Sequence, residues 1–165
     1  MEKTIIAIDP GTRYWGVTVF KGMEIVISTV KTFSTKGSVK HRTKAAKMAF
    51  LSLFDQYVFD ILVIEKPFPF WSEQSRLLNK IIEEIKNSAR KQGMKVYEYS
   101  PRTVRKAVCN DGNNSKREAA QAVCLFYPEL KIYLNQDRRY KEIYWGHMFD
   151  SVGLGICYLR KREKR

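Results

Sequence analysis

Two short apolar runs, each followed at once by a carboxylate, constrain this 165-residue chain more than any other feature. Ile5–Ile8 precedes Asp9, and Ile61–Ile64 precedes Glu65. Uninterrupted apolar runs of this length are typical of strands that are buried on both faces of a sheet. A carboxylate at the end of a buried strand is costly unless something positive compensates it. The pattern therefore predicts a covered sheet with an acidic site at one of its edges.

The order of the expected elements indicates an α/β fold. We expect strands over 3–9, 15–20, 24–30, 61–64 and 94–99, and helices over 42–57, 72–92, 101–108, from 115 onwards and over 147–159. Residues 128–146 show no regular pattern. An antiparallel meander followed by alternating helices and strands predicts a mixed five-stranded sheet of the ribonuclease-H-like type, with helices on both faces. We expect a single domain over residues 1–165, with a short basic tail at about 160–165.

The excess of basic residues predicts a polyanionic partner. The formal net charge is +13, and no acidic residue occurs between Ile25 and Phe54. A second basic stretch, Lys86–Lys106, contains a single acidic residue, Glu98. Nucleic acid is favoured over an anionic membrane surface because the charges are spread over several elements instead of one amphipathic helix. No apolar run approaches the roughly 20 residues of a membrane span, and we see no signal peptide, so we expect a cytoplasmic protein.

His147 and Asp150 are three residues apart on an expected helix and so share one face. Together with Asp9 and Glu65 they offer mostly hard oxygen ligands, which suit Mg²⁺ or Mn²⁺ better than Zn²⁺. An acidic cluster in a strongly basic chain is typical of a metal-dependent enzyme that acts on a polyanion, here a nuclease. The alternatives are an ion pair between Glu65 and Lys66, and a structural role for His147.

Three further positions are candidates for binding nucleic acid. Lys116 and Arg117 lie in the first turn of an expected helix, where a phosphate would be favoured and where exposed cations could also simply be tolerated. Phe68 is held between two prolines beside Glu65, so its ring could stack on an unpaired base or cover the core. The turn Asp9-Pro10-Gly11-Thr12 also fits actin-like ATPases, but 165 residues cannot supply their two large domains.

The chain resembles the RuvC family of Holliday-junction resolvases over nearly its whole length. The matching motifs, in family order, are Ile8-Asp9-Pro10-Gly11-Thr12-Arg13 with Gly16, Ile64-Glu65 with Phe68, Tyr99-Ser100-Pro101-Arg102-x-Val104-Arg105-Lys106-x-Val108, Lys116, and His147-x-x-Asp150 opening the last helix. Each motif is modest alone, and together they are specific.

The resemblance implies a structure-selective endodeoxyribonuclease that cuts four-way DNA junctions with two Mg²⁺ or Mn²⁺ ions per site. It implies that Asp9, Glu65, His147 and Asp150 are the catalytic metal ligands. It further implies that Phe68 inserts at the junction and that Arg105 and Lys116 contact the DNA backbone, and we expect their basic neighbours Lys106 and Arg117 to contact DNA too. Paired symmetric nicks imply a homodimer. A branch-migration helicase partner is not deducible from the sequence, nor is a role in a viral or mobile-element host.

Departures from the family and two alternative functions accompany this interpretation. The position of His147 is often Asp in the family, and residues 128–146 are longer and more basic than its usual approach to the last helix. The first alternative is a ribonuclease-H-like nuclease that acts on RNA or RNA–DNA hybrids, such as an rRNA-processing enzyme. The second is a protein that binds branched DNA without cutting it, and its sign would be the loss of an acidic ligand, which this sequence does not show.

Overall fold

The computed structural model describes residues 2–67, 69, 71–135 and 139–163, with the side chains of 139–142 excepted. Within this part of the chain, five strands form one sheet in the order β3-β2-β1-β4-β5. Its members are β1 (Thr4–Asp9), β2 (Tyr14–Lys21), β3 (Glu24–Thr32), β4 (Ile61–Glu65) and β5 (Lys95–Tyr99). The meander β1-β2-β3 is antiparallel, whereas β4 pairs in parallel with both β1 and β5. The predicted mixed five-stranded sheet is confirmed.

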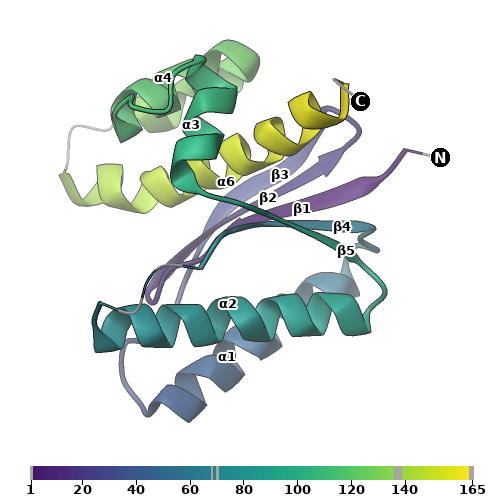
Figure 1. Ribbon diagram of the computed structural model, residues 1–165, viewed down its shortest axis with the longest axis vertical. Helices are drawn as coiled ribbons and strands as arrows, with labels where there is room; N and C mark the ends of the chain where they lie inside the picture. Colours follow the sequence, from purple (N-terminus) through teal and green to yellow (C-terminus); the bar gives the residue numbers. More distant parts are fainter. Residues whose placement is uncertain (1, 68, 70, 136–138, 164–165) are drawn as a thin grey trace.

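Helices cover both faces of this sheet, as predicted (Figure 1). One face carries α1 (Val39–Leu51) and α2 (Glu73–Lys91), and the other carries α3 (Pro101–Cys109), α4 (Lys116–Phe126) and α6 (Arg139–Glu163). The shorter elements are the 3-10 turns Ser52–Asp55 and Pro128–Leu130 and the one-turn helix α5 (Lys131–Leu134). Side chains alternate along each strand. Ile6 and Ile8 therefore pack towards α1 and α2, while Ile5 and Ala7 pack towards α6.

Serines set the starts of several helices. Ser38, Ser72, Ser100 and Ser115 each accept a hydrogen bond from a backbone N–H in the first turn of the helix that follows. Such caps satisfy backbone donors that have no partner inside the helix. Ser115 and Glu118 form a capping box, in which each side chain accepts a hydrogen bond from the backbone N–H of the other residue. The cap at Ser38 starts α1 three residues before the predicted Arg42, and α1 ends at Leu51 instead of Tyr57.

The largest difference from the sequence prediction concerns the last helix. Residues 128–146 were expected to be irregular, but they contain a 3-10 turn, α5 and the first two turns of α6, which begins at Arg139. His147 and Asp150 therefore lie inside the helix instead of opening it. Gly146 costs about 1 kcal/mol in a helix relative to Ala. Contacts with the sheet offset this cost, because the Tyr144 ring packs edge-on against Tyr14 and its hydroxyl donates to the carbonyl of Val30.

Helix α6 lies directly on β2, and the residues in contact recur at nearly the same distance along both elements. Gly16, Thr18 and Phe20, which alternate along one face of β2, meet His147, Ser151 and Gly155, which are spaced four apart on α6. Two residues of a strand advance about 6.6 Å and four residues of a helix about 6 Å, so successive contacts stay in step. A Cβ at Gly16 would overlap the backbone of His147, and one at Gly155 would overlap the Phe20 ring.

Two glycines of α6 face different neighbours, because Gly155 packs on Phe20 of the sheet whereas Gly153 faces α3. A Cβ at Gly153 would approach Val104 of α3 at 3.0 Å. Gly153 thus allows α3, not the sheet, to lie close to α6.

We predict that Gly16→Ala lowers the free energy of unfolding by about 1–3 kcal/mol, because the added methyl group must displace the backbone of α6. Gly146→Ala is the matched control, since no described atom lies within 4 Å of a Cβ at that position and Ala favours the helix. Chemical denaturation of both variants would measure the difference. Wild-type stability in Gly16→Ala would contradict the contact described above.

Candidate active site

Asp9 and Glu65 lie at the carboxyl ends of two neighbouring parallel strands. Ile8 pairs with Ile64, so the residue that follows each of them emerges at the same edge of the sheet. Asp9 is only 4% exposed, and its carboxyl group is hydrogen-bonded to that of Glu65. The predicted pairing of these carboxylates is thus seen in the structure. The partner of Glu65 is therefore Asp9, and not Lys66 as in the alternative ion pair.

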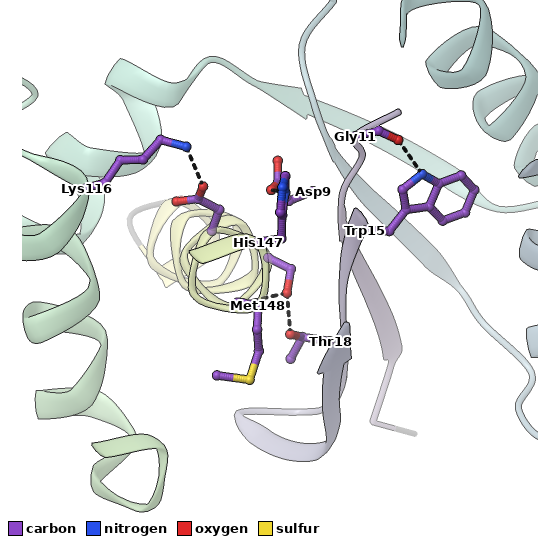
Figure 2. Close-up of polar contacts among 9 residues, drawn as sticks. Asp9, Gly11, Trp15, Thr18, Lys116, His147 and Met148 are labelled. Carbon is purple, nitrogen blue, oxygen red and sulfur yellow. Dashed lines mark hydrogen bonds and ion pairs between the residues drawn. The ribbon is translucent and has the colours of Figure 1, made fainter. Parts of the chain in front are cut away.

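His147 reaches the same carboxyl pair from α6. Its Nδ1 lies 2.7 Å from Oδ2 of Asp9 (Figure 2). Gly16 is the cross-strand partner of Asp9, and the missing side chain there leaves the space that the backbone of His147 fills. The imidazole is further flanked by the ring of Tyr14, whose centroid is 6.0 Å away.

Asp150 lies one helical turn after His147 and faces Lys116 at the start of α4. The Lys116 Nζ donates to Oδ2 of Asp150 at 3.2 Å (Figure 2). Asp150 also raises the pKa values of both Asp9 and Glu65 through its charge, and Lys116 lowers them. The structure therefore brings Asp9, Glu65, His147 and Asp150 into one region, as the sequence predicted, and adds an ammonium group to them.

The protonation of this region follows from burial. Loss of solvation is the main cause that raises the pKa of Asp9, and it raises the pKa of Glu65 to about 10. Burial also lowers the pKa of His147, against the charge of Asp150, which raises it. At neutral pH Glu65 thus keeps its proton, and the imidazole of His147 is neutral. A neutral imidazole is the form that ligates metals, and two carboxyl groups in contact favour a cation between them.

The donor set fits a hard divalent cation, although the side chains are not yet arranged around one. Among the described residues, no group of three or more acidic, His or Cys side chains is positioned to hold a metal ion. Asp9 is hydrogen-bonded to Glu65 and His147, and Asp150 is turned to Lys116. Small side-chain rotations, coupled to loss of the shared protons, would release these oxygens. A cavity of about 350 Å³ opens over Asp9, Glu65 and His147.

The predicted DNA-contact residues differ in their surroundings. The Arg105 guanidinium donates to the carbonyl oxygens of Asn114 at 2.9 Å and Pro101 at 3.4 Å, so it braces the loop before α4. Lys106 is exposed and lines a basic groove of about 860 Å³ with Arg102, Arg160 and Lys161. Arg117 is exposed in the first turn of α4. Phe68 lies outside the described residues.

One residue of the predicted basic stretches has a different role. Lys86 is 6% exposed, and its ammonium group pairs with Glu83 at 2.7 Å and with Glu98 at 3.0 Å. It is therefore a buried structural cation and contributes no basic surface.

Tyr14 and Gln74, which were not among the predicted site residues, also line the cavity over Asp9. The Gln74 Nε2 lies 3.5 Å from the Thr12 hydroxyl, and Arg13 lies over the Tyr14 ring. Tyr14 begins β2 two residues after the Asp9-Pro10-Gly11-Thr12 turn, and this nearness in the sequence was the available signal. Gln74 is brought in by α2 from a distant part of the chain, and no local pattern marks it.

Comparison with known proteins identifies the family. The family model described as "Crossover junction endodeoxyribonuclease RuvC" matches residues 5–133. The chain is 24% identical over 165 residues to the RuvC of Cytophaga hutchinsonii, covering 96% of this chain and 76% of the relative. It is 25% identical over 170 residues to the RuvC of Mesorhizobium japonicum, covering 96% and 90% respectively.

Solved structures show the same fold. Thermus thermophilus RuvC superposes with a TM-score of 0.74 at 19% identity, covering 98% of this chain and 96% of that one. The same protein solved with a Holliday junction substrate also gives 0.74, at 18% identity and the same coverage. The yeast mitochondrial Holliday junction resolvase Ydc2 gives 0.74 at 14% identity, covering 97% of this chain and 79% of that one. With a family model matched over most of its length, the chain belongs to the RuvC family of crossover junction endodeoxyribonucleases.

Proposed function

We propose that this chain is a metal-dependent endodeoxyribonuclease that resolves four-way DNA junctions by paired symmetric nicks. The observation that carries the proposal is the buried Asp9–Glu65 carboxyl pair, joined by His147 and Asp150 of α6 at the edge of a strongly basic molecule. Membership of the RuvC family supports the reaction, and the junction-bound relative of the same fold supports the substrate. No helix in the described part of the chain is long and apolar enough to cross a membrane.

Asp9, Glu65, His147 and Asp150 would hold two Mg²⁺ or Mn²⁺ ions. The ions would supply activation of the attacking water and stabilisation of the departing oxygen of the phosphodiester. Asp9 contacts both Glu65 and His147, so it would be the central ligand of this set. The 2.7 Å contact between its Oδ2 and the His147 Nδ1 is a hydrogen bond, which orients the imidazole beside the carboxyl pair.

Three exposed basic residues would contact the DNA. The Lys116 side chain is 81% exposed although it donates directly to Asp150, so the same ammonium group could turn to a phosphate. Arg117 beside it and Lys106 in the basic groove would add phosphate contacts that position the strand without reading its sequence. We further propose a homodimer, because two incisions related by symmetry require two such sites.

We predict that Asp9→Asn and Glu65→Gln abolish cleavage while junction binding is largely retained. Each change removes a ligand charge but keeps the shape, and the basic surface that supplies affinity is untouched. The measurement uses labelled four-way junction, duplex and RNA–DNA hybrid, with and without Mg²⁺. Full cleavage by either variant would remove that residue from the site, and preferential cleavage of the hybrid would instead support the RNA-directed alternative.

We predict that Glu65→Gln changes the pH dependence of stability in the absence of metal. The folded protein keeps a proton on Glu65 that the unfolded chain releases above its ordinary pKa of 4.5, so stability falls as pH rises from there towards about 10. Gln cannot ionise, so the variant should lose less stability, by up to about 1.4 kcal/mol per pH unit. Thermal unfolding with a chelator measures this, and equal pH slopes would contradict the assigned proton.

We predict that Lys116→Met strengthens metal binding, because Asp150 loses its 3.2 Å cationic partner and is free to ligate. The gain should reach at most about fivefold, since an exposed ion pair contributes about 0.2–1 kcal/mol. Calorimetric titration with Mn²⁺ in the absence of DNA measures it. Lys106→Met is the control: both variants should bind junctions more weakly with a flatter salt dependence, and Lys106→Met should leave metal affinity unchanged. Equal metal affinities would show that Lys116 does not compete for Asp150.

A further inference from the structure

A second cavity adjoins the active site and shares Lys116 and His147 with it. It measures about 320 Å³ and lies between the start of α4, α5 and the first turns of α6. Its wall includes Lys116 and Arg117 of α4, Tyr133 of α5, and Ile143, Trp145 and His147 of α6. We refer to this cavity as the aromatic groove. Nothing in the proposed cleavage chemistry uses it.

The aromatic wall of the groove is held by ring contacts that lead back to the active site. The Tyr133 and Trp145 rings pack at 4.3 Å between centroids, and Tyr144 meets Trp145 edge-on at 4.9 Å. Tyr144 in turn packs against Tyr14, which flanks the imidazole of His147. The groove is therefore anchored to β2 and placed at a defined position beside the carboxyl pair. Tyr133 and Trp145 remain partly exposed and can meet a ligand.

The chemistry of the groove suits a nucleotide. Lys116 and Arg117 stand in the first turn of α4, and their charges favour a phosphate, while Glu118 of the same turn is engaged in the capping box with Ser115. Stacking of a base on aromatic side chains contributes about 1–3 kcal/mol and tolerates any sequence. A cation pair next to an aromatic wall, in a molecule of net charge +13, complements an anionic base-bearing strand better than a peptide.

We propose that the aromatic groove binds one unpaired nucleotide that neighbours the scissile phosphate. Its base would pack against Tyr133, Trp145 and Ile143, and its phosphate would lie at Lys116 and Arg117. The shared residues Lys116 and His147 place this nucleotide next to the phosphate that is cut. The family model match ends at residue 133, so Ile143 and Trp145 lie beyond the matched part. The inference rests on the proposed function and adds a subsite to it.

Photo-crosslinking locates the nucleotide. Four-way junctions carrying 5-iododeoxyuridine at successive positions around the crossover are bound to the full chain without divalent metal and irradiated, and the crosslinked residues are identified by mass spectrometry. We expect crosslinks to Tyr133 or Trp145 from a narrow set of positions next to the cleavage site. Crosslinks from every position alike, or none to either residue, overturn the proposal.

Two matched variants test the contribution to affinity. Ile143→Glu places a carboxylate on the groove, and Leu125→Glu places one on α4 outside it, at side chains that are 58% and 79% exposed. Both positions are exposed enough for melting temperatures to stay near that of the wild type. We expect Ile143→Glu to weaken junction binding about tenfold more than Leu125→Glu, and this excess to vanish when the crosslinked position is made abasic.

The outcomes separate this inference from the proposed function. If the wild type binds and cuts junctions while the two variants have equal affinities, the groove is not a nucleotide site. If Ile143→Glu changes the oligomeric mass and leaves junction affinity equal to that of Leu125→Glu, the groove holds a second copy of the chain, and the proposal is again wrong. A wild type that neither binds nor cuts junctions overturns the proposed function, and this inference with it.

Discussion

The contact between α6 and β2 is the interaction on which the site depends. Asp9 and Gly16 are cross-strand partners, so their side-chain positions lie next to each other on the face that α6 covers. Because Gly16 has no side chain, the backbone of His147 occupies that space, and its imidazole reaches Asp9. The buried hydrogen bond between Thr18 and Ser151 and the contact of Phe20 with Gly155 continue the same contact along both elements. Asp150, one turn after His147, is thereby brought close enough for its charge to act on the carboxyl pair.

That geometry has an electrostatic cost which the protein compensates in two ways. Burial raises the pKa values of Asp9 and Glu65, so without a bound cation the pair retains a proton at neutral pH. Lys116 supplies a charge of the opposite sign at Asp150 and lowers the pKa values of both buried carboxyl groups. Both compensations are reversible, because the carboxyl pair can release its proton and the exposed ammonium group of Lys116 can turn away from Asp150. A site of this kind is folded before it is loaded, and binding a divalent cation would exchange protons and an ammonium group for metal.

Some basic residues of the chain hold its structure together, and others are exposed and can meet a ligand. Lys86 is buried between two glutamates, and Arg105 is half-buried and holds the loop before α4. Arg160 donates to the carbonyl of Ala107 and lies over the Phe126 ring, so it fixes the end of α6 against α3 and α4. Lys106, Lys116 and Arg117 are exposed. A count of basic residues therefore overstates the surface that can bind DNA, although its sign is correct.

The sequence by itself determined the sheet and the identity of its acidic residues. Uninterrupted apolar runs must be buried on both faces, and a carboxylate after each run is placed at the sheet edge by local geometry alone. The spacing of His147 and Asp150 on one face of an expected helix, together with the family motif, added these two residues. Only the tertiary structure decided where α6 begins, because Arg139–Gly146 has no helical pattern of its own and is held by contacts of Tyr144 with Tyr14 and Val30. Likewise, the pairing of Lys116 with Asp150 and the roles of Lys86 and Arg105 depend on partners distant in the chain, which no local pattern encodes.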